Sequence, residues 1–234
     1  MQKTMTFTLD TESLTGEVLS LAFLGRALYI EPEREWLQGL IAEQVFADAP
    51  FGVDQAETKQ GLELLQSWST KHANGISDQD FFDLKQDYTR LFIGLDPIMP
   101  VPPWESVYLS RDHMVFQDET RQVREWYFRF NLAPEKLHKE PDDHIALELI
   151  FLSRLAQLSL MALEQNDQQA FQVYCQAQAD FLTEHLLRWG LVWCRRMEEH
   201  ARTDFYRGLG YLTHGSLLEL AATLNVQFPK EASL

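Results

Sequence analysis

The stretch IALELIFLSRLAQLSLMAL (residues 145–163) is the most apolar long segment of the chain, and it indicates the fold class. The long polar side chains of Glu148, Arg154 and Gln157 interrupt it. A helix that crosses a membrane would carry few or no such residues. The spacing therefore predicts an amphipathic helix that is buried in a protein made of helices.

The same helical spacing of apolar residues continues on both sides of this segment. It is present in residues 14–28, 36–45, 62–68, 81–92, 118–130, 171–186, 189–200 and 203–225. The chain shows no convincing alternating pattern of a strand and no repeat of fixed period. We therefore predict an all-α fold: a single globular domain over residues 1–234 with about nine or ten helices.

Prolines interrupt the helical pattern at two places, which we predict to be loops of this one domain. The first is LDPIMPVPPW (95–104), whose four prolines forbid a helix and favour an extended path. The second is the proline-flanked segment 131–142. At the end of this segment, Asp142 or Asp143 is expected to cap the long helix, because carboxylates suit a helix N-terminus.

Composition limits the classes of partner. The 234 residues include 35 Asp and Glu against 20 Lys and Arg, a formal net charge of −15. This charge repels phosphate backbones, so nucleic acid is not an expected partner, whereas a cationic segment is. The N-terminus MQKTMTFTLDTESL lacks the pattern of an export signal. We expect a cytoplasmic protein that is not embedded in a membrane.

A group of aromatic and apolar residues is the first candidate site. Tyr88, Leu91 and Phe92 fall on adjacent faces of the last turns of a predicted helix. Such a stripe usually belongs to the core. However, Pro103 and Trp104 follow at the end of the stiff proline run, and extended proline-rich loops beside aromatic residues can form grooves that receive peptides.

The segment EPDDH (140–144) is the second candidate site. It places three carboxylates around one imidazole, at a turn that a proline forces before a helix. One interpretation is a helix cap with His144 paired to a neighbouring acid. The other is an anionic pocket for an Arg or Lys of a partner, in which His144 orients the bound charge. The residues alone leave both interpretations open.

The sequence predicts no catalytic residue, metal or cofactor. A di-iron site in a helical bundle needs two Glu-x-x-His pairs on separate helices, and Glu135 with His138 is the one such pair. Glu140, His144 and Glu148 are four apart, but a proline places Glu140 before the helix. Phosphate-binding loops and serine-nucleophile motifs are absent from the sequence.

Four motifs in chain order resemble the TorD/DmsD family of redox-enzyme maturation chaperones. DYTRLFIG (87–94) resembles the family's aromatic-x-x-Leu-Phe-x-Gly motif, and EPDDH (140–144) resembles its Glu-Pro-x-Asp-His motif. MPVPPWESVYLSRDHMVFQDET (99–120) looks like the proline-proline-tryptophan loop of the DmsD branch and the segment after it. DFYRGLGYL (204–212) is similar to Phe-Tyr-Arg-x-Leu-x-x-Leu. The resemblance covers most of the chain from about residue 80. It is closest to the DmsD branch, although Tyr88 stands where close DmsD proteins carry Trp.

This resemblance implies an all-helical, TorD-like chaperone of the cytoplasm without enzymatic turnover. Such a protein binds the twin-arginine signal peptide of a molybdopterin-containing reductase of the dimethyl sulfoxide or trimethylamine N-oxide type. It delays export until the cofactor has been inserted and folding is complete. The implied partners are this leader peptide and the apo-form of the catalytic subunit. Contact with the translocase or with cofactor-insertion proteins is left open.

Carried over to this chain, the resemblance and the local chemistry predict a signal-peptide-binding set. The arginine end would be received by Asp143 together with Glu140 and His144. The apolar end would lie in a groove lined by Tyr88, Leu91, Phe92, Pro103 and Trp104, with Arg111 organising the groove by pairing with a nearby carboxylate. Two alternatives remain: a helical metalloenzyme that uses His144 and nearby carboxylates, and an acidic assembly factor that binds a folded subunit surface.

Overall fold

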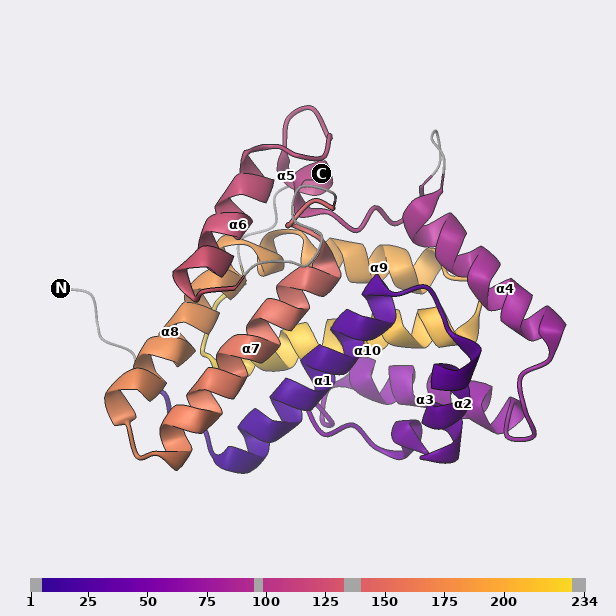
Figure 1. Cartoon of the computed structure of the whole chain (residues 1–234), viewed down its shortest axis with the longest axis horizontal. Helices are drawn as coiled ribbons and strands as arrows, with labels where there is room; N and C mark the ends of the chain where they lie inside the picture. The colour runs from indigo at the N-terminus through magenta and orange to yellow at the C-terminus, as the bar shows by residue number, and fades with distance from the viewer. Residues whose placement is uncertain (1–5, 95–98, 133–139, 229–234) are drawn as a thin grey trace.

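A computed structural model describes residues 6–94, 99–132 and 140–228, and its described residues contain helices but no strand (Figure 1). The helices are α1 (Thr11–Tyr29), α2 (Arg34–Ala42), α3 (Ala56–Lys71), α4 (Asp78–Tyr88), α5 (Glu105–Leu109), α6 (Asp118–Arg129), α7 (Ile145–Glu164), α8 (Gln168–Glu184), α9 (Gly190–His200) and α10 (Asp204–Thr223). A π-helical turn, η2 (Thr89–Ile93), continues α4, and 3-10 turns lie at Val45–Ala47 (η1) and Leu186–Arg188 (η3). The predicted all-α class is confirmed.

Short polar side chains fix several helix starts. Asp10, Ser77, Asp167 and Thr203 each accept a hydrogen bond from the backbone N–H three residues later. These bonds satisfy amide groups that the first turn of a helix leaves without a partner. The start of α7 differs, because its N-cap is His144, whose Nδ1 accepts from the N–H of Ala146 at 3.1 Å. The prediction that an aspartate caps this helix was therefore wrong.

Two helix pairs form the body of the molecule. α1 lies along α7, and α10 lies along α3, while α8 and α9 flank α7 and α10 respectively (Figure 1). Gly25 allows the close approach of α1 to α7: a Cβ added there would lie 2.5 Å from Cγ1 of Ile150 and 3.0 Å from the carbonyl oxygen of Ala146. A larger residue would force the two helices apart.

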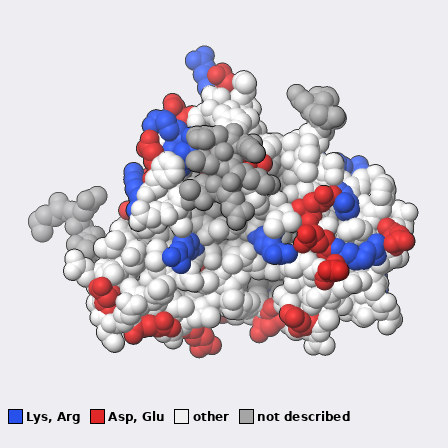
Figure 2. Space-filling model, viewed as in Figure 1, with Lys and Arg blue, Asp and Glu red and all other residues white. Residues whose placement is uncertain are grey.

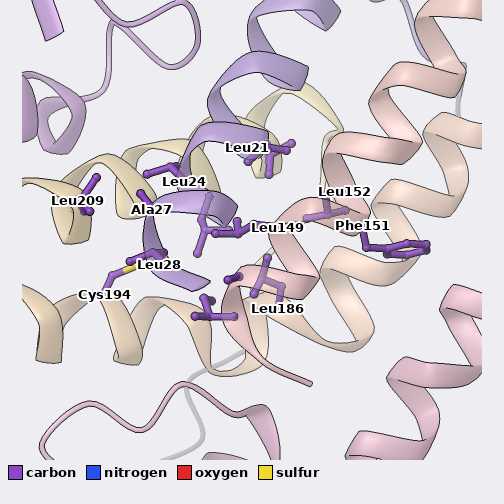
Figure 3. Close-up of a cluster of buried hydrophobic side chains, with 14 of the residues drawn as sticks. Leu21, Leu24, Ala27, Leu28, Leu149, Phe151, Leu152, Leu186, Cys194 and Leu209 are labelled. Atoms are coloured by element: carbon purple, nitrogen blue, oxygen red, sulfur yellow. The ribbon is translucent and has the colours of Figure 1, made fainter. Parts of the chain in front are cut away.

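The core lies where these helices meet. Figure 3 shows side chains of α1, such as Leu24 and Leu28, beside Leu149 and Leu152 of α7 and residues of η3, α9 and α10. One cluster of buried hydrophobic residues extends from Phe7 to Leu224. This continuity supports our proposal of a single domain, whose two predicted loops lie partly outside the described residues (95–98 and 133–139).

Among the helices of the described residues, α7 alone is long and apolar enough to match a membrane span by length and composition. Its most apolar window is 61% buried inside the protein, and residues such as Leu149, Leu152 and Leu155 are inaccessible to solvent. The core helix of a soluble protein passes the same composition test, so the match is weak support for a membrane segment. The prediction of a buried amphipathic helix is confirmed.

The core contains an ionisable side chain, Glu17 of α1, which is 1% exposed. Burial raises its pKa from 4.5 to about 8, since the low-dielectric surroundings disfavour the charged form. The folded protein therefore holds a proton on Glu17 at pH values where the unfolded chain has lost it. The contribution of Glu17 to stability falls as pH rises above about 4.5 and levels off above about 8.

We predict that Glu17→Gln removes part of this pH dependence. The free energy of unfolding of the wild type should decline between pH 5.5 and 8 with a contribution of up to about 1.4 kcal/mol per pH unit from this group, which the variant lacks. Urea unfolding at several pH values measures it, with the exposed Glu63→Gln as a control of equal charge change. Equal pH slopes for Glu17→Gln and the wild type would contradict the assignment.

Candidate functional site at the Trp104–His144 bridge

The two candidate segments of the sequence meet at a short backbone bridge. The N–H of Ile145 donates to the carbonyl oxygen of Pro103 at 2.7 Å, and the N–H of Glu105 donates to that of Asp143 at 2.9 Å. Trp104 and His144 are thereby paired as an isolated antiparallel bridge. Residues some forty positions apart in sequence are held side by side immediately before α5 and α7.

Side chains of the two segments and of α1 converge at this bridge. Nε1–H of Trp104 donates to Oε1 of Glu140 at 3.1 Å. The His144 ring packs edge-on against Trp104 and Tyr29, with ring centroids 6.2 and 5.3 Å away. The hydroxyl of Tyr88 donates to the carbonyl oxygen of Tyr29 at 2.9 Å. The structure thus brings together four predicted residues around Tyr29, at the end of α1, which sequence reasoning missed.

Accessibility divides this set. Trp104 and Glu140 are half-buried and reach the surface. His144 is 6% exposed and Pro103 is buried, so a partner cannot contact them directly, and His144 packs against the inner side of Trp104. A carboxylate beside a partly exposed indole can accept hydrogen bonds from a guanidinium group while the ring packs against its flat face. Glu140 is therefore the carboxylate of EPDDH that a partner can reach.

Asp143 is engaged inside the protein. It is fully buried, its Oδ2 accepts from the N–H of Ser106 at 2.7 Å, and its Oδ1 accepts from the hydroxyl of Thr120 at 2.7 Å. Because its side chain is inaccessible to solvent, an arginine of a partner could reach it only after a rearrangement of the surrounding segments. In this structure, Asp143 joins the starts of α5 and α6 to the start of α7, in contrast to the direct contact predicted from sequence.

Asp142 is likewise buried and bound within the protein. Its Oδ2 lies 2.6 Å from Nε and 2.5 Å from Nη2 of Arg124, and its carbonyl oxygen accepts from the Tyr127 hydroxyl at 2.9 Å. Arg124 on α6 therefore pairs with a carboxylate of the motif, whereas from the sequence we expected Arg111 to pair with a nearby carboxylate. Arg111 itself lies exposed in the turn after α5.

The predicted apolar groove is closed in this structure. Tyr88, Leu91 and Phe92 are 6%, 0% and 4% exposed, respectively. Phe92 stacks on Trp193 of α9 at 6.4 Å between ring centroids and meets Tyr206 of α10 edge-on at 6.0 Å. These three residues therefore belong to the core as the helices stand, and a peptide could reach them only after a rearrangement.

A buried group of ionisable residues lies directly beneath the bridge. Nδ1 of His185 lies 2.9 Å from Oε2 of Glu105, and both side chains are almost inaccessible. Burial raises the pKa of Glu105, against the opposing effect of His185. Burial, together with the nearby carboxyls of Glu105 and Asp143, raises the pKa of Glu148 well above its usual 4.5. The protonated form of Glu148 is therefore favoured, and a neutral carboxyl limits repulsion among the three acids.

The first and last motifs of the sequence are tied by Asp87 of DYTRLFIG. Its Oδ2 accepts from the N–H groups of Arg202 and Thr203 and from the Thr203 hydroxyl, all within 2.9 Å. Its Oδ1 lies 2.7 Å from Nη2 of Arg90, which also donates to the carbonyl oxygen of His200. Asp87 thereby fixes the end of α4 against the start of α10.

The metal alternative gains no support from the geometry. Within residues 6–94, 99–132 and 140–228, no group of three or more His, Cys, Asp and Glu is arranged to hold a metal ion. The Glu135–His138 pair lies outside the described residues.

Comparison with known proteins identifies the family. Residues 53–195 match the family described as nitrate reductase delta subunit, and the chain belongs to it. A relative from Haemophilus influenzae, named "Probable Tat proofreading chaperone DmsD", is 25% identical over 95% of this chain and 96% of its own length. The Tat proofreading chaperone DmsD of Salmonella typhimurium is 32% identical over 60% of this chain and 62% of that relative. The chaperone protein TorD of Aliivibrio fischeri is 34% identical over 46% of this chain and 48% of that relative. The predicted membership of the TorD/DmsD family is confirmed.

We predict that Asp143→Asn lowers the free energy of unfolding by about 1–3 kcal/mol, because an amide cannot accept from both Ser106 and Thr120 as the carboxylate does. Thr120→Val removes one of the same bonds, so the two changes should be less than additive when combined. Urea unfolding followed by circular dichroism measures both, with the exposed Asp112→Asn as control. Wild-type stability of Asp143→Asn would contradict the structural role of this carboxylate.

Proposed function

We propose that this protein is a cytoplasmic chaperone that binds the twin-arginine signal peptide of a molybdopterin-containing reductase. It would retain the apo-form of the catalytic subunit until cofactor insertion and folding are complete. The names of the relatives, Tat proofreading chaperone and chaperone protein, support this role and favour neither a metalloenzyme nor another enzyme. The reductase of the dimethyl sulfoxide or trimethylamine N-oxide type is the finer part of the proposal.

The observation that carries the proposal is the partly exposed Trp104–Glu140 pair, which lies next to the hydrogen-bonded bridge and the buried Asp143. Glu140 offers a carboxylate to arginine, and Trp104 offers an indole ring to the guanidinium or to an apolar neighbour. The bridge beneath and the buried aspartates hold both residues in place, so little conformational entropy is lost on binding.

Charge supports the same partner. A net charge of −15 attracts a cationic leader over a distance and accelerates encounter. Figure 2 shows acidic and basic side chains side by side at the right and upper left of one face, further acidic groups along its lower edge, and broad uncharged areas between them. Attraction of this kind raises the association rate for basic peptides in general, so selectivity for arginine must come from a direct contact such as the one at Glu140.

We predict that wild-type protein binds a twin-arginine leader peptide with a roughly micromolar Kd, and that a twin-lysine version binds more weakly. Glu140→Gln should weaken binding of the arginine peptide about tenfold, because it removes a charge-assisted hydrogen bond. Trp104→Phe should weaken it less, since it retains a ring but loses the indole N–H that orients Glu140. Calorimetric titration at two salt concentrations measures these effects.

The matched control is Glu164→Gln, an exposed change of equal charge at the opposite end of α7, about 30 Å from Glu140 along a helix of this length. It should alter long-range attraction only, and the peptide should bind it almost as it binds the wild type. Equal weakening by both Gln variants would remove the direct contact at Glu140 from the proposal. No binding of any twin-arginine leader by the wild type would contradict the proposed function itself.

A further inference from the structure

An apolar cavity of about 320 Å³ lies between α1, residues 45–51, α3 and α10, away from the bridge. This volume is within the range of pockets that bind ligands. Its lining is mainly apolar and includes Leu19, Phe23, Val45, Phe46, Phe51 and Leu212. Asp48 is the one charged residue among the described residues that line it.

The rim of this cavity exposes large apolar side chains. Leu19 of α1 is 56% exposed and Val45 of η1 is 37% exposed, and both line the cavity. Contact between such side chains and an apolar partner removes their surface from water, which is favourable by about 25 cal/mol per Å². Burial of the exposed apolar surface of Leu19 and Val45 by a partner would therefore favour binding at this cavity.

α1 connects the cavity to the Trp104–His144 bridge. Tyr29, in the last turn of α1, packs against His144. Phe23 and Leu19 precede it by six and ten residues, which corresponds to about 9 and 15 Å along a helix axis. An extended peptide advances roughly 3.3 Å per residue, so about five residues suffice to pass from the bridge to the cavity. Ile30, directly after α1, is 42% exposed.

We propose that this cavity binds the apolar stretch of the twin-arginine leader whose arginines lie at Trp104 and Glu140. The inference rests on the proposed function and adds a second contact region for the same peptide. One peptide would thus lie along α1, with its cationic end at the bridge and its apolar end between α1 and residues 45–51.

Charge selects this occupant over others. An apolar lining with a single carboxylate, Asp48, accepts a neutral or cationic segment and disfavours an acidic one. A second copy of this chain would bring another net charge of −15 to the surface, so self-association is opposed by repulsion. Since Tyr88, Leu91 and Phe92 are buried, the groove predicted from sequence gives the apolar stretch no open site in this structure.

The test combines a protein variant with a peptide variant. Leu19→Gln and Val45→Gln together make the rim polar without changing charge, and both positions are exposed, so the fold should persist. The matched control combines Val173→Gln and Met161→Gln, at positions 55% and 43% exposed on α8 and α7. We expect the rim variant to bind the leader roughly tenfold more weakly than the wild type, and the control to bind it unchanged. Thermal unfolding of each variant verifies the fold.

A leader whose apolar stretch is replaced by serine and glycine completes the cycle. It should bind the wild type and the rim variant equally weakly, because the contact that the variant removes is already absent. Unchanged binding of the intact leader by the rim variant would overturn the inference and leave the proposed function standing. The same conclusion would follow if the rim change weakened binding of the serine-glycine leader by the same factor as binding of the intact leader. Failure of the wild type to bind any leader would overturn both.

Photo-crosslinking provides a second readout that is independent of affinity. A leader with a diazirine-bearing leucine analogue in its apolar stretch should crosslink to α1 or to residues 45–51. Crosslinks confined to other segments, with leader binding intact, would place the apolar stretch elsewhere and overturn the inference alone.

Discussion

The candidate site depends on one constraint: the buried carboxylate of Asp143 and the backbone bridge beside it. Asp143 accepts hydrogen bonds from Ser106 and Thr120 while its own carbonyl accepts from Glu105. A buried carboxylate is tolerated where its acceptor positions are filled, and losing one partner leaves a costly unpaired charge. These bonds set where the starts of α5, α6 and α7 meet. The positions of Trp104 and Glu140 at the surface follow from them.

Three other buried acids, Glu105, Glu148 and Asp87, lie near the bridge or join other helices. Glu105 and Glu148 lie beneath the bridge with raised pKa values, so burial there reduces charge where carboxyls crowd together. Asp87 performs a related task at a distance, because it joins the end of α4 to the start of α10. In this chain, the motif residues Asp87, Asp142 and Asp143 are buried and hydrogen-bond to other segments of the protein. Glu140 is partly exposed, and at the bridge it is the motif carboxylate that a partner can reach.

Much of the fold follows from local sequence. Apolar spacing predicted the helices, and short polar residues such as Ser77 and Asp167 mark their starts because they can bond to first-turn amides. The cap of α7 could not be predicted in this way. The aspartates beside it are drawn into bonds with α5 and α6, which leaves His144 to accept from Ala146. Long-range partners overrode the local preference.

The candidate site was predictable in part. Trp104, Glu140 and His144 do lie together, as their motifs indicated. Helical spacing states which residues share a face but not what covers that face, and Phe92 is covered by Trp193 and Tyr206 from about a hundred residues later. The cavity beside α1 could not be predicted either, since separate segments each contribute a few ordinary apolar residues to it.

The central claim is that a leader peptide binds at the Trp104–Glu140 surface. Amide hydrogen exchange with and without a twin-arginine leader tests it most directly, because it reports where protection appears along the whole chain. The account predicts slower exchange around residues 104–106 and 140–146 and along the end of α1 when the peptide is bound. Protection confined to segments remote from the bridge, with saturating leader present, would contradict it.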